Sequence, residues 1–224
     1  MTDYHSHILP NMDDGSKSIA ESLSLLREEV RQGVDTVVMT PHFYASQNSP
    51  KQFLKRRYEA FRRLLPALDR SCPRIILGAE VQFFPGISDC EELSLLTIGQ
   101  TKLLLLEMPF SQWDAQTIQE TLLLQERRDV RVVLAHIDRY YSDQSRSLWK
   151  ELHDSGILMQ LNTSALESPL ERLRCRKLID KGIIHMLGSD CHNLANRPPK
   201  WGHVSQDISQ KVLENMRWAM GGKR

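Results

Sequence analysis

Long apolar runs and a strong excess of either charge are both missing from this sequence of 224 residues. The longest strongly apolar run covers residues 103–106, far short of the roughly 20 residues that a membrane-spanning helix needs. The formal net charge is +1, which gives the chain as a whole no bias towards nucleic acids or anionic lipids. The first residues show no basic and apolar leader. We therefore expect a cytoplasmic protein that neither inserts into membranes nor has nucleic acid as its partner.

Cysteine is also scarce, and its four copies are scattered at positions 72, 90, 175 and 191. They form no C-x-x-C pair, so we expect free thiols and no disulfide framework. Linkers, low-complexity tracts and internal repeats are missing too, and we expect residues 1–224 to form a single domain.

Short apolar segments alternate with longer helical patterns along the whole chain. Seven strands are predicted, near residues 3–5, 36–40, 74–80, 102–107, 131–136, 158–162 and 185–190. Helices are predicted after a capping box at Ser18 and Glu21, over residues 51–68, 115–128, 144–155 and 169–181, and finally over 206–220, where the last helix would close the structure. In the first helix, Leu23, Leu26 and Val30 are expected to face the core. Gly33, Gly156 and Gly182 fit helix ends. The alternation predicts an α/β fold with a parallel sheet, best as a distorted TIM-like (β/α)7 barrel; an open doubly wound sheet is the alternative.

Histidine and acidic residues stand at the ends of six of the seven predicted strands. They are His5 and His7, His42, Glu80, Glu107, His136, and Asp190 with His192. A parallel barrel brings all carboxyl ends of its strands to one face, where barrel enzymes have their active sites. Each of these residues alone is more simply an ordinary polar residue, but coincidence at six strand ends is improbable. We therefore predict a shared metal site. The remaining histidines, His153, His185 and His203, have no such placement.

Imidazole and carboxylate ligands in this mixture suit Mn²⁺, Fe or Zn²⁺, and they outnumber what one ion needs. Clusters of this kind polarise a phosphoryl group and generate hydroxide from bound water. The sequence therefore indicates a metal-dependent phosphoesterase.

Several segments carry most of these residues in a fixed order along the chain, namely residues 3–10, 13–16, 40–42, 78–80, 135–140, 188–193 and 197–199. In this order they resemble the PHP (polymerase and histidinol phosphatase) superfamily. Within it, they are most similar to the bacterial CpsB/YwqE-type protein-tyrosine phosphatases of capsule and exopolysaccharide systems. Together they span nearly the whole chain.

The resemblance implies a distorted (β/α)7 barrel with three metals, usually manganese. One metal would be held by His5, His7, Glu80 and Asp190; a second by Glu80, Glu107 and His136; a third by Asp14, His42 and His192. Asp13 would be a loop residue or would support a ligand. Arg139 and Arg197 would contact the phosphate, because a guanidinium offers fork-like donors to its oxygens. The implied reaction is hydrolysis of phosphotyrosine on a bacterial tyrosine kinase by a metal-bound hydroxide.

Cys191 and Arg197 also match the C-x5-R signature of cysteine-dependent tyrosine phosphatases. We reject this reading because Cys191 lies between Asp190 and His192 and should face away from them. The intervening residues contain no glycine, and two prolines follow where such a loop would need backbone donors.

Three other interpretations of the function remain. Within the superfamily, the chain could be a small-molecule phosphatase of the histidinol-phosphate type. A nuclease-like phosphodiesterase is the second; Lys55, Arg56, Arg57, Arg62 and Arg63 form a basic stretch that could hold nucleic acid. That stretch could instead be a solvated face balanced by Glu59, or could dock an acidic tail. The last is a metal-binding protein without catalysis, which would not need two arginines at the mouth.

Overall fold

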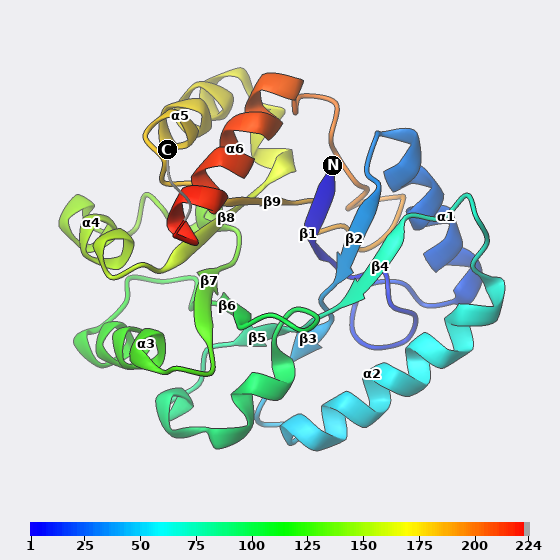
Figure 1. Ribbon diagram of the computed structural model, residues 1–224, viewed down its shortest axis with the longest axis horizontal. Helices are drawn as coiled ribbons and strands as arrows, with labels where there is room; N and C mark the ends of the chain where they lie inside the picture. Colours follow the sequence, from blue (N-terminus) through cyan, green and yellow to red (C-terminus); the bar gives the residue numbers. More distant parts are fainter. Residues whose placement is uncertain (222–224) are drawn as a thin grey trace.

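The computed structural model describes residues 1–221, so the last three residues of the expected domain lie outside the description. In this range a parallel sheet curls round with helices outside it (Figure 1). The strands are β1 (Thr2–Ser6), β2 (Thr36–Met39), β3 (His42–Phe43), β4 (Arg74–Leu77), β5 (Glu80–Gln82), β6 (Leu103–Glu107), β7 (Arg131–Leu134), β8 (Leu158–Asn162) and β9 (Met186–Gly188). The α-helices are α1 (Ile19–Arg31), α2 (Pro50–Leu64), α3 (Ala115–Glu126), α4 (Arg146–Asp154), α5 (Pro169–Asp180) and α6 (Gln206–Ala219).

The sheet is a ring of seven strand positions that is interrupted twice. The second position consists of β2 followed by β3, and the third of β4 followed by β5, so that β1-β2-β4 and β3-β5-β6-β7-β8-β9 form two parallel sheets. The first and last positions meet through a parallel bridge between Ser6 and Cys191. The predicted distorted barrel is confirmed. The open doubly wound alternative is excluded because the strand positions follow one another in chain order around the ring and β1 contacts β9, the last strand.

Two apolar cores hold this ring. The larger lies between the strands and the outer helices, and the smaller fills the inside of the barrel with residues such as Val38, Leu105 and Val133. Met216 and Ala219 of α6 pack against the inner core. The expectation that the last helix closes the structure is therefore confirmed.

Helix boundaries follow local chemistry. The serines that precede α1, α2, α4 and α6, and the aspartate before α3, each accept a hydrogen bond from the third backbone N–H of the helix. At α1 only half of the predicted capping box forms, since Glu21 accepts instead from the N–H of Lys17. The three glycines predicted as helix ends all have positive φ.

Three expectations were wrong in detail. The strand predicted over 74–80 breaks at Gly78, where a side chain would meet Thr40 and Ile98 at 3.2 Å. The last strand ends at Gly188, and Asp190 adopts a left-handed backbone with φ 52°. Val30 is exposed, and α1 buries the face of Ser22, Leu25, Leu26 and Glu29 instead, because two of its core contacts are polar and leave no apolar signal.

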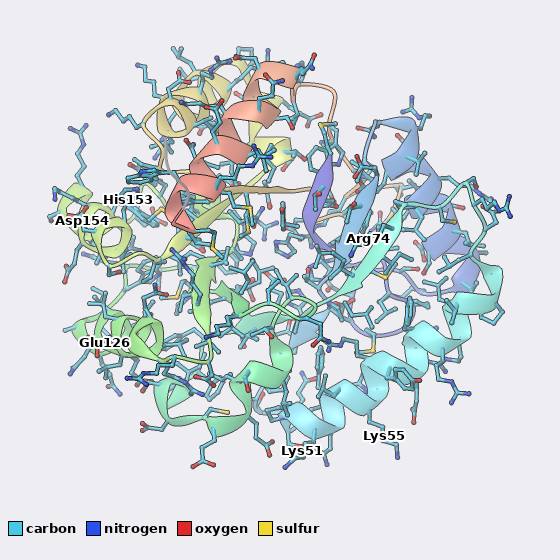
Figure 2. All side chains as sticks on the ribbon, in the orientation of Figure 1. Lys51, Lys55, Arg74, Glu126, His153 and Asp154 are labelled. Atoms are coloured by element: carbon cyan, nitrogen blue, oxygen red, sulfur yellow. The ribbon has the colours of Figure 1, made fainter. Side chains whose placement is uncertain are left out.

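The basic stretch on α2 is not one uniform surface. Lys51 and Lys55 point away from the barrel (Figure 2), but Arg57 is buried and donates to the carbonyl of Gly78. Arg57 therefore supports the strand break and is not available to a partner. Among residues 1–221, no helix combines the length and apolar character that a membrane span needs.

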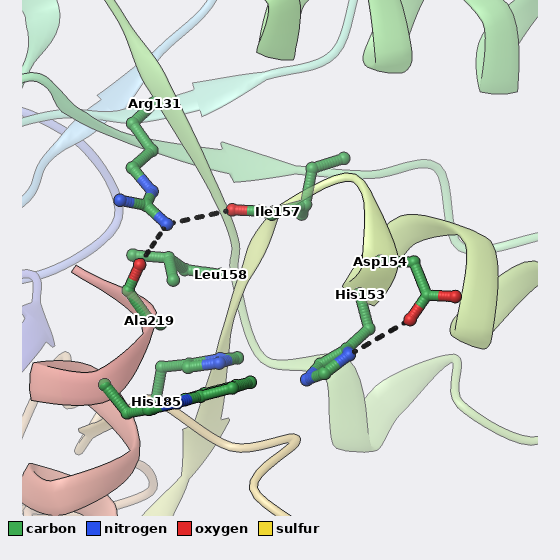
Figure 3. Close-up of a pocket in the computed structure, with 9 residues that line it drawn as sticks. Arg131, His153, Asp154, Ile157, Leu158, His185 and Ala219 are labelled. Carbon is green, nitrogen blue, oxygen red and sulfur yellow. Dashed lines mark hydrogen bonds and ion pairs between the residues drawn. The ribbon is translucent and has the colours of Figure 1, made fainter. Parts of the chain in front are cut away.

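His185 lies at the other end of the barrel from the strand ends that carry the predicted ligands. It lines a cavity of about 490 Å³ together with Arg131 and Leu158, which begin β7 and β8, and with His153 near the end of α4 (Figure 3). Its Nδ1 accepts a hydrogen bond from the N–H of Met159. Burial, aided by the positive charges of His153 and Arg131, lowers the pKa of His185 to about 4. The ring is therefore neutral in the folded protein.

This burial predicts an acid-sensitive fold. The unfolded chain takes up a proton at His185 near its ordinary pKa of 6.5, whereas the folded chain does so only near 4. The contribution is therefore complete above about pH 6.5 and is lost as pH falls towards 4, by about 3 kcal/mol in total. In urea unfolding of the chelator-treated protein, His185→Gln should lose less stability than wild type over this range. The exposed His203→Gln is the matched control, and parallel curves for wild type and His185→Gln would contradict the prediction.

Candidate metal centre

All nine predicted ligands lie together at the carboxyl end of the barrel. Three groups each place one ligand atom per residue within 4.8 Å of one another: His7 with Asp14, His42 and His192; His5 with His7 and Asp190; and His42 with Glu80 and Glu107. His136 joins through its Nε2, which lies 2.9 Å from Glu80 Oε1 and 3.5 Å from Glu107 Oε1. His153, His185 and His203 are outside the cluster, as expected.

Glu80 is at the centre of this arrangement. Its Oε2 atom has three imidazole nitrogens at 3.1 Å, from His5, His7 and His42. Nevertheless Oε2 makes no hydrogen bond within the described chain, and neither do the buried Nδ1 atoms of His42 and His136. Buried carboxylate and imidazole atoms without hydrogen-bond partners are costly, and cations satisfy them. The donor set therefore fits divalent metals.

The two strand breaks bring these residues together. After Met39 the chain leaves β2, passes Pro41 and pairs again as β3, so that His42 lies opposite Glu80 of β5. At the seam, Gly188 lets β9 approach β1, since a side chain there would meet His5 Cβ at 2.5 Å. His136 and Asp190 are two of the three non-glycine residues with positive φ in the described range. Such strained backbone is typical of functional sites.

Protonated imidazole already brings positive charge into the cluster. Burial opposes a charged imidazole at His136, but hydrogen bonds to Glu107 and Glu80 outweigh it and raise the pKa to about 9. Burial likewise opposes ionisation of Asp190, yet His5 and His7 keep its pKa well below the usual range. Asp190 is therefore ionised and requires cations beside it.

Several supporting residues were missed or undervalued in the sequence. Asp13 accepts at Oδ2 from the N–H of His42 and lies 2.7 Å from His7 Nδ1, so it orients two ligands at once. Gln160 Oε1 accepts from the N–H of His136 and contacts His5 Nδ1 at 3.2 Å. Asn162 donates to Asp190 Oδ2. Gln160 and Asn162 are two apart in an otherwise apolar strand, which was the available signal.

The two arginines lie beside Asp190. Arg139 is paired with its Oδ2, and Arg197 Nη2 donates to its Oδ1 at 2.8 Å. Each guanidinium is partly exposed. Together they line a hollow of about 210 Å³ with Ser164, Asn196 and Lys200. The mouth of the cluster therefore presents cationic donors next to the ligands.

Cys191 faces away from the cluster, as expected. It is fully buried, and its Sγ lies 3.6 Å from Glu29 Oε1, behind the ligands. Burial and the nearby Glu29 and Asp3 carboxyl groups raise the pKa of its thiol well above the usual range. A neutral, inaccessible thiol has no nucleophilic role.

Comparison with known proteins places these features in a family. Tyrosine-protein phosphatase CpsB of Streptococcus pneumoniae is 29% identical over 224 residues, covering 94% of this chain and 90% of that protein. The CpsB of Streptococcus agalactiae serotype III is 31% identical over 217 residues, covering 89% and 86%. Tyrosine-protein phosphatase YwqE of Bacillus subtilis is 30% identical over 205 residues, covering 88% and 79%.

Solved structures agree with the fold. A chain from the crystal structures of YwqE from Bacillus subtilis and CpsB from Streptococcus pneumoniae, described there as metal-dependent tyrosine phosphatases, aligns with a TM-score of 0.75 and 24% identity, covering 100% of this chain and 89% of that one. The Mycobacterium tuberculosis phosphotriesterase aligns with a TM-score of 0.52 and 10% identity, covering 96% and 87%.

The family model described as capsular polysaccharide synthesis, CpsB/CapC, matches residues 1–220. The chain therefore belongs to the CpsB/CapC family.

Proposed function

We propose that this protein is a metal-dependent protein-tyrosine phosphatase. The observation that carries the proposal is Glu80 Oε2, which faces three imidazole nitrogens at 3.1 Å without a hydrogen bond and so calls for bound cations. The similar proteins, which this chain matches over most of their length, are named tyrosine-protein phosphatases, and this supports phosphotyrosine as the substrate.

The proposed metals are three divalent ions, with Mn²⁺ preferred and Fe or Zn²⁺ accepted by the same donors. His5, His7, Glu80 and Asp190 would hold the first ion. Glu80, Glu107 and His136 would hold the second, and Asp14, His42 and His192 the third. The close spacing of His5, His7 and Asp190, and of Asp14, His42 and His192, supports the first and third sets; His42 also lies close to Glu80 and Glu107. Asp14 is largely exposed and stands at the rim. Bound ions would supply Lewis acidity to the phosphoryl group and lower the pKa of water.

The chain's own residues bind and orient the phosphate. Arg139 and Arg197 would turn their guanidinium donors from Asp190 to the non-bridging oxygens, where paired N–H groups match the geometry of a phosphate. Asp13, Gln160 and Asn162 hold the ligand side chains in position. The proposed substrate is a phosphotyrosine protein, namely a bacterial tyrosine kinase of capsule or exopolysaccharide synthesis, and the proposed location is the cytoplasm. Residues 1–224 would act as one catalytic domain.

The first test compares substrates and removes the metals. A phosphotyrosine peptide, histidinol phosphate and single-stranded DNA are assayed in parallel with Mn²⁺ and with a chelator. The peptide should be preferred, and both the chelator and His136→Ala should reduce phosphate release by more than about 100-fold, because loss of a ligand exceeds the effect of losing its support. His153→Ala, outside the cluster, is the control. Preference for histidinol phosphate or DNA would contradict the proposed substrate, and chelator-resistant hydrolysis would contradict the proposed metals.

The arginines are tested by a change that keeps their charge. Arg139→Lys and Arg197→Lys should each lower kcat/KM for the peptide by about 10- to 100-fold, since a lysine cannot donate bidentately. Metal content, measured by elemental analysis, should stay at the wild-type level. Arg62→Lys on the exposed side of α2 is the matched control. Wild-type kinetics in both site variants would show that the arginines do not bind the phosphate.

The buried cysteine provides a negative test. Cys191→Ser should change kcat/KM by no more than about twofold, since the thiol is neutral and faces Glu29. Complete loss of activity with full metal content would instead indicate a cysteine-dependent reaction.

A further inference from the structure

Phe110 is an exposed aromatic ring in direct contact with the candidate metal centre. It lies in the loop between β6 and α3, three residues after Glu107, and its side chain is 57% exposed. Its ring stacks on that of His136, with centroids 5.6 Å apart and an angle of 17° between the planes. The guanidinium carbon of Arg139 lies 5.9 Å from the Phe110 centroid. Phe110 therefore borders both a metal-site histidine and a proposed phosphate ligand.

The loop that carries Phe110 is fixed on both sides. Gln144 accepts from the N–H of Trp113 and donates to the carbonyl of Ser111. The indole N–H of Trp113 donates to the carbonyl of Pro109 at 2.9 Å. The fully buried Tyr140 lies behind Phe110, with ring centroids 6.2 Å apart. The exposed ring is therefore held in place before any ligand arrives.

The exposed face of this ring is unfavourably hydrated in the protein alone, but it offers a surface on which an aromatic ligand can stack. Other exposed large apolar side chains, such as Tyr58 and Leu170, lie on outer helices away from the centre. Among the exposed large apolar residues of the described chain, Phe110 is the one with a ring contact to the ligand cluster. Because Phe110 borders both His136 and Arg139, the substituent of a phosphate ester bound at Arg139 would lie within reach of the Phe110 ring.

We propose that Phe110 is a specificity-determining residue that selects aryl phosphate esters by stacking on the ring of the leaving group. This inference rests on the proposed phosphatase function and adds the group that distinguishes a tyrosyl from an alkyl ester. Stacked or edge-to-face aromatic pairs are favourable beyond the area they bury. Arg139 above the same ring links recognition of the phosphate to recognition of its aromatic substituent.

Tyr44 is the rival position. Its ring stacks on His42 with centroids 5.2 Å apart, on the Asp14 side of the centre, and it is half-buried. Phe110 is favoured because it is more exposed and lies beside an arginine. The two positions make different predictions for the same assay.

The test compares phenyl phosphate with butyl phosphate on the Mn²⁺-loaded protein. The measured quantity is the ratio of their kcat/KM values, in each variant relative to wild type, so that the intrinsic reactivity of the two esters cancels. Phe110→Leu should lower this ratio by about three- to tenfold, whereas Phe110→Tyr, which keeps an aromatic ring, should leave it at the wild-type value. Metal content and melting temperature should remain those of wild type, because leucine still covers His136. Tyr58→Leu, an exposed ring on α2, should leave the ratio unchanged.

Three results would overturn the inference. If Phe110→Leu lowered kcat/KM equally for both esters, Phe110 would only shield His136. The same would follow if Phe110→Leu lost bound metal and Phe110→Tyr kept it while the ratio stayed the same in both variants. A lowered ratio in Tyr44→Leu but not in Phe110→Leu would place the leaving group on the other side. A wild-type protein that hydrolyses neither ester would contradict the proposed function itself, which separates the two failures.

Discussion

The structure depends on one constraint: Glu80 Oε2, a buried carboxylate oxygen, must lie close to three imidazole rings. It can have three imidazole nitrogens at 3.1 Å because β5 begins at Glu80, after a break that ends β4 at Leu77. That break leaves Gly78 in a place where a side chain would be crowded by Thr40 and Ile98, and the carbonyl of Gly78 accepts a hydrogen bond from the buried guanidinium of Arg57. A buried arginine on an outer helix therefore helps to maintain the strand break, and the break places the charged Glu80 carboxylate in the ligand cluster. Irregular backbone of this kind is retained where a site needs it.

The sequence was sufficient for the parallel barrel and for the convergence of the ligands, since both depend on rules that act locally. Alternation of elements predicts parallel strands, and parallel strands deliver their carboxyl ends to one face. The strand breaks could not be predicted, because apolar runs such as residues 74–80 look the same whether they form one strand or two. The left-handed backbone of Asp190 was hidden for a similar reason: it depends on the seam with β1, which is made by residues far away in the chain.

The polar supports of the site show a second limit. Gln160 was read as part of an apolar strand, yet it connects His136, His5 and Asn162, and through Asn162 it reaches Asp190. A polar residue that bonds to ligands from other strands has no local signature apart from being polar in a buried strand. The buried face of α1 was misread for the same reason, since Ser22 and Glu29 belong to it. Stability and chemistry are also divided between the two ends of the barrel: α6 and His185 lie at the amino ends of the strands, and the ligands at the carboxyl ends.

The seam between β1 and β9 has a consequence for the order of folding. Asp3 accepts from the backbone N–H and the hydroxyl of Ser189, 186 positions later, and the N–H of Asp190 donates to the carbonyl of His5. The residues proposed to hold the first metal come from both sides of this seam, so this part of the site cannot form before residues 188–191 have been synthesised. Contacts of such long range form late, after the entropy of closing the chain has been overcome. Ions that bind only the closed ring would then keep it closed, because the free energy by which they stabilise the native state increases as they bind it more tightly.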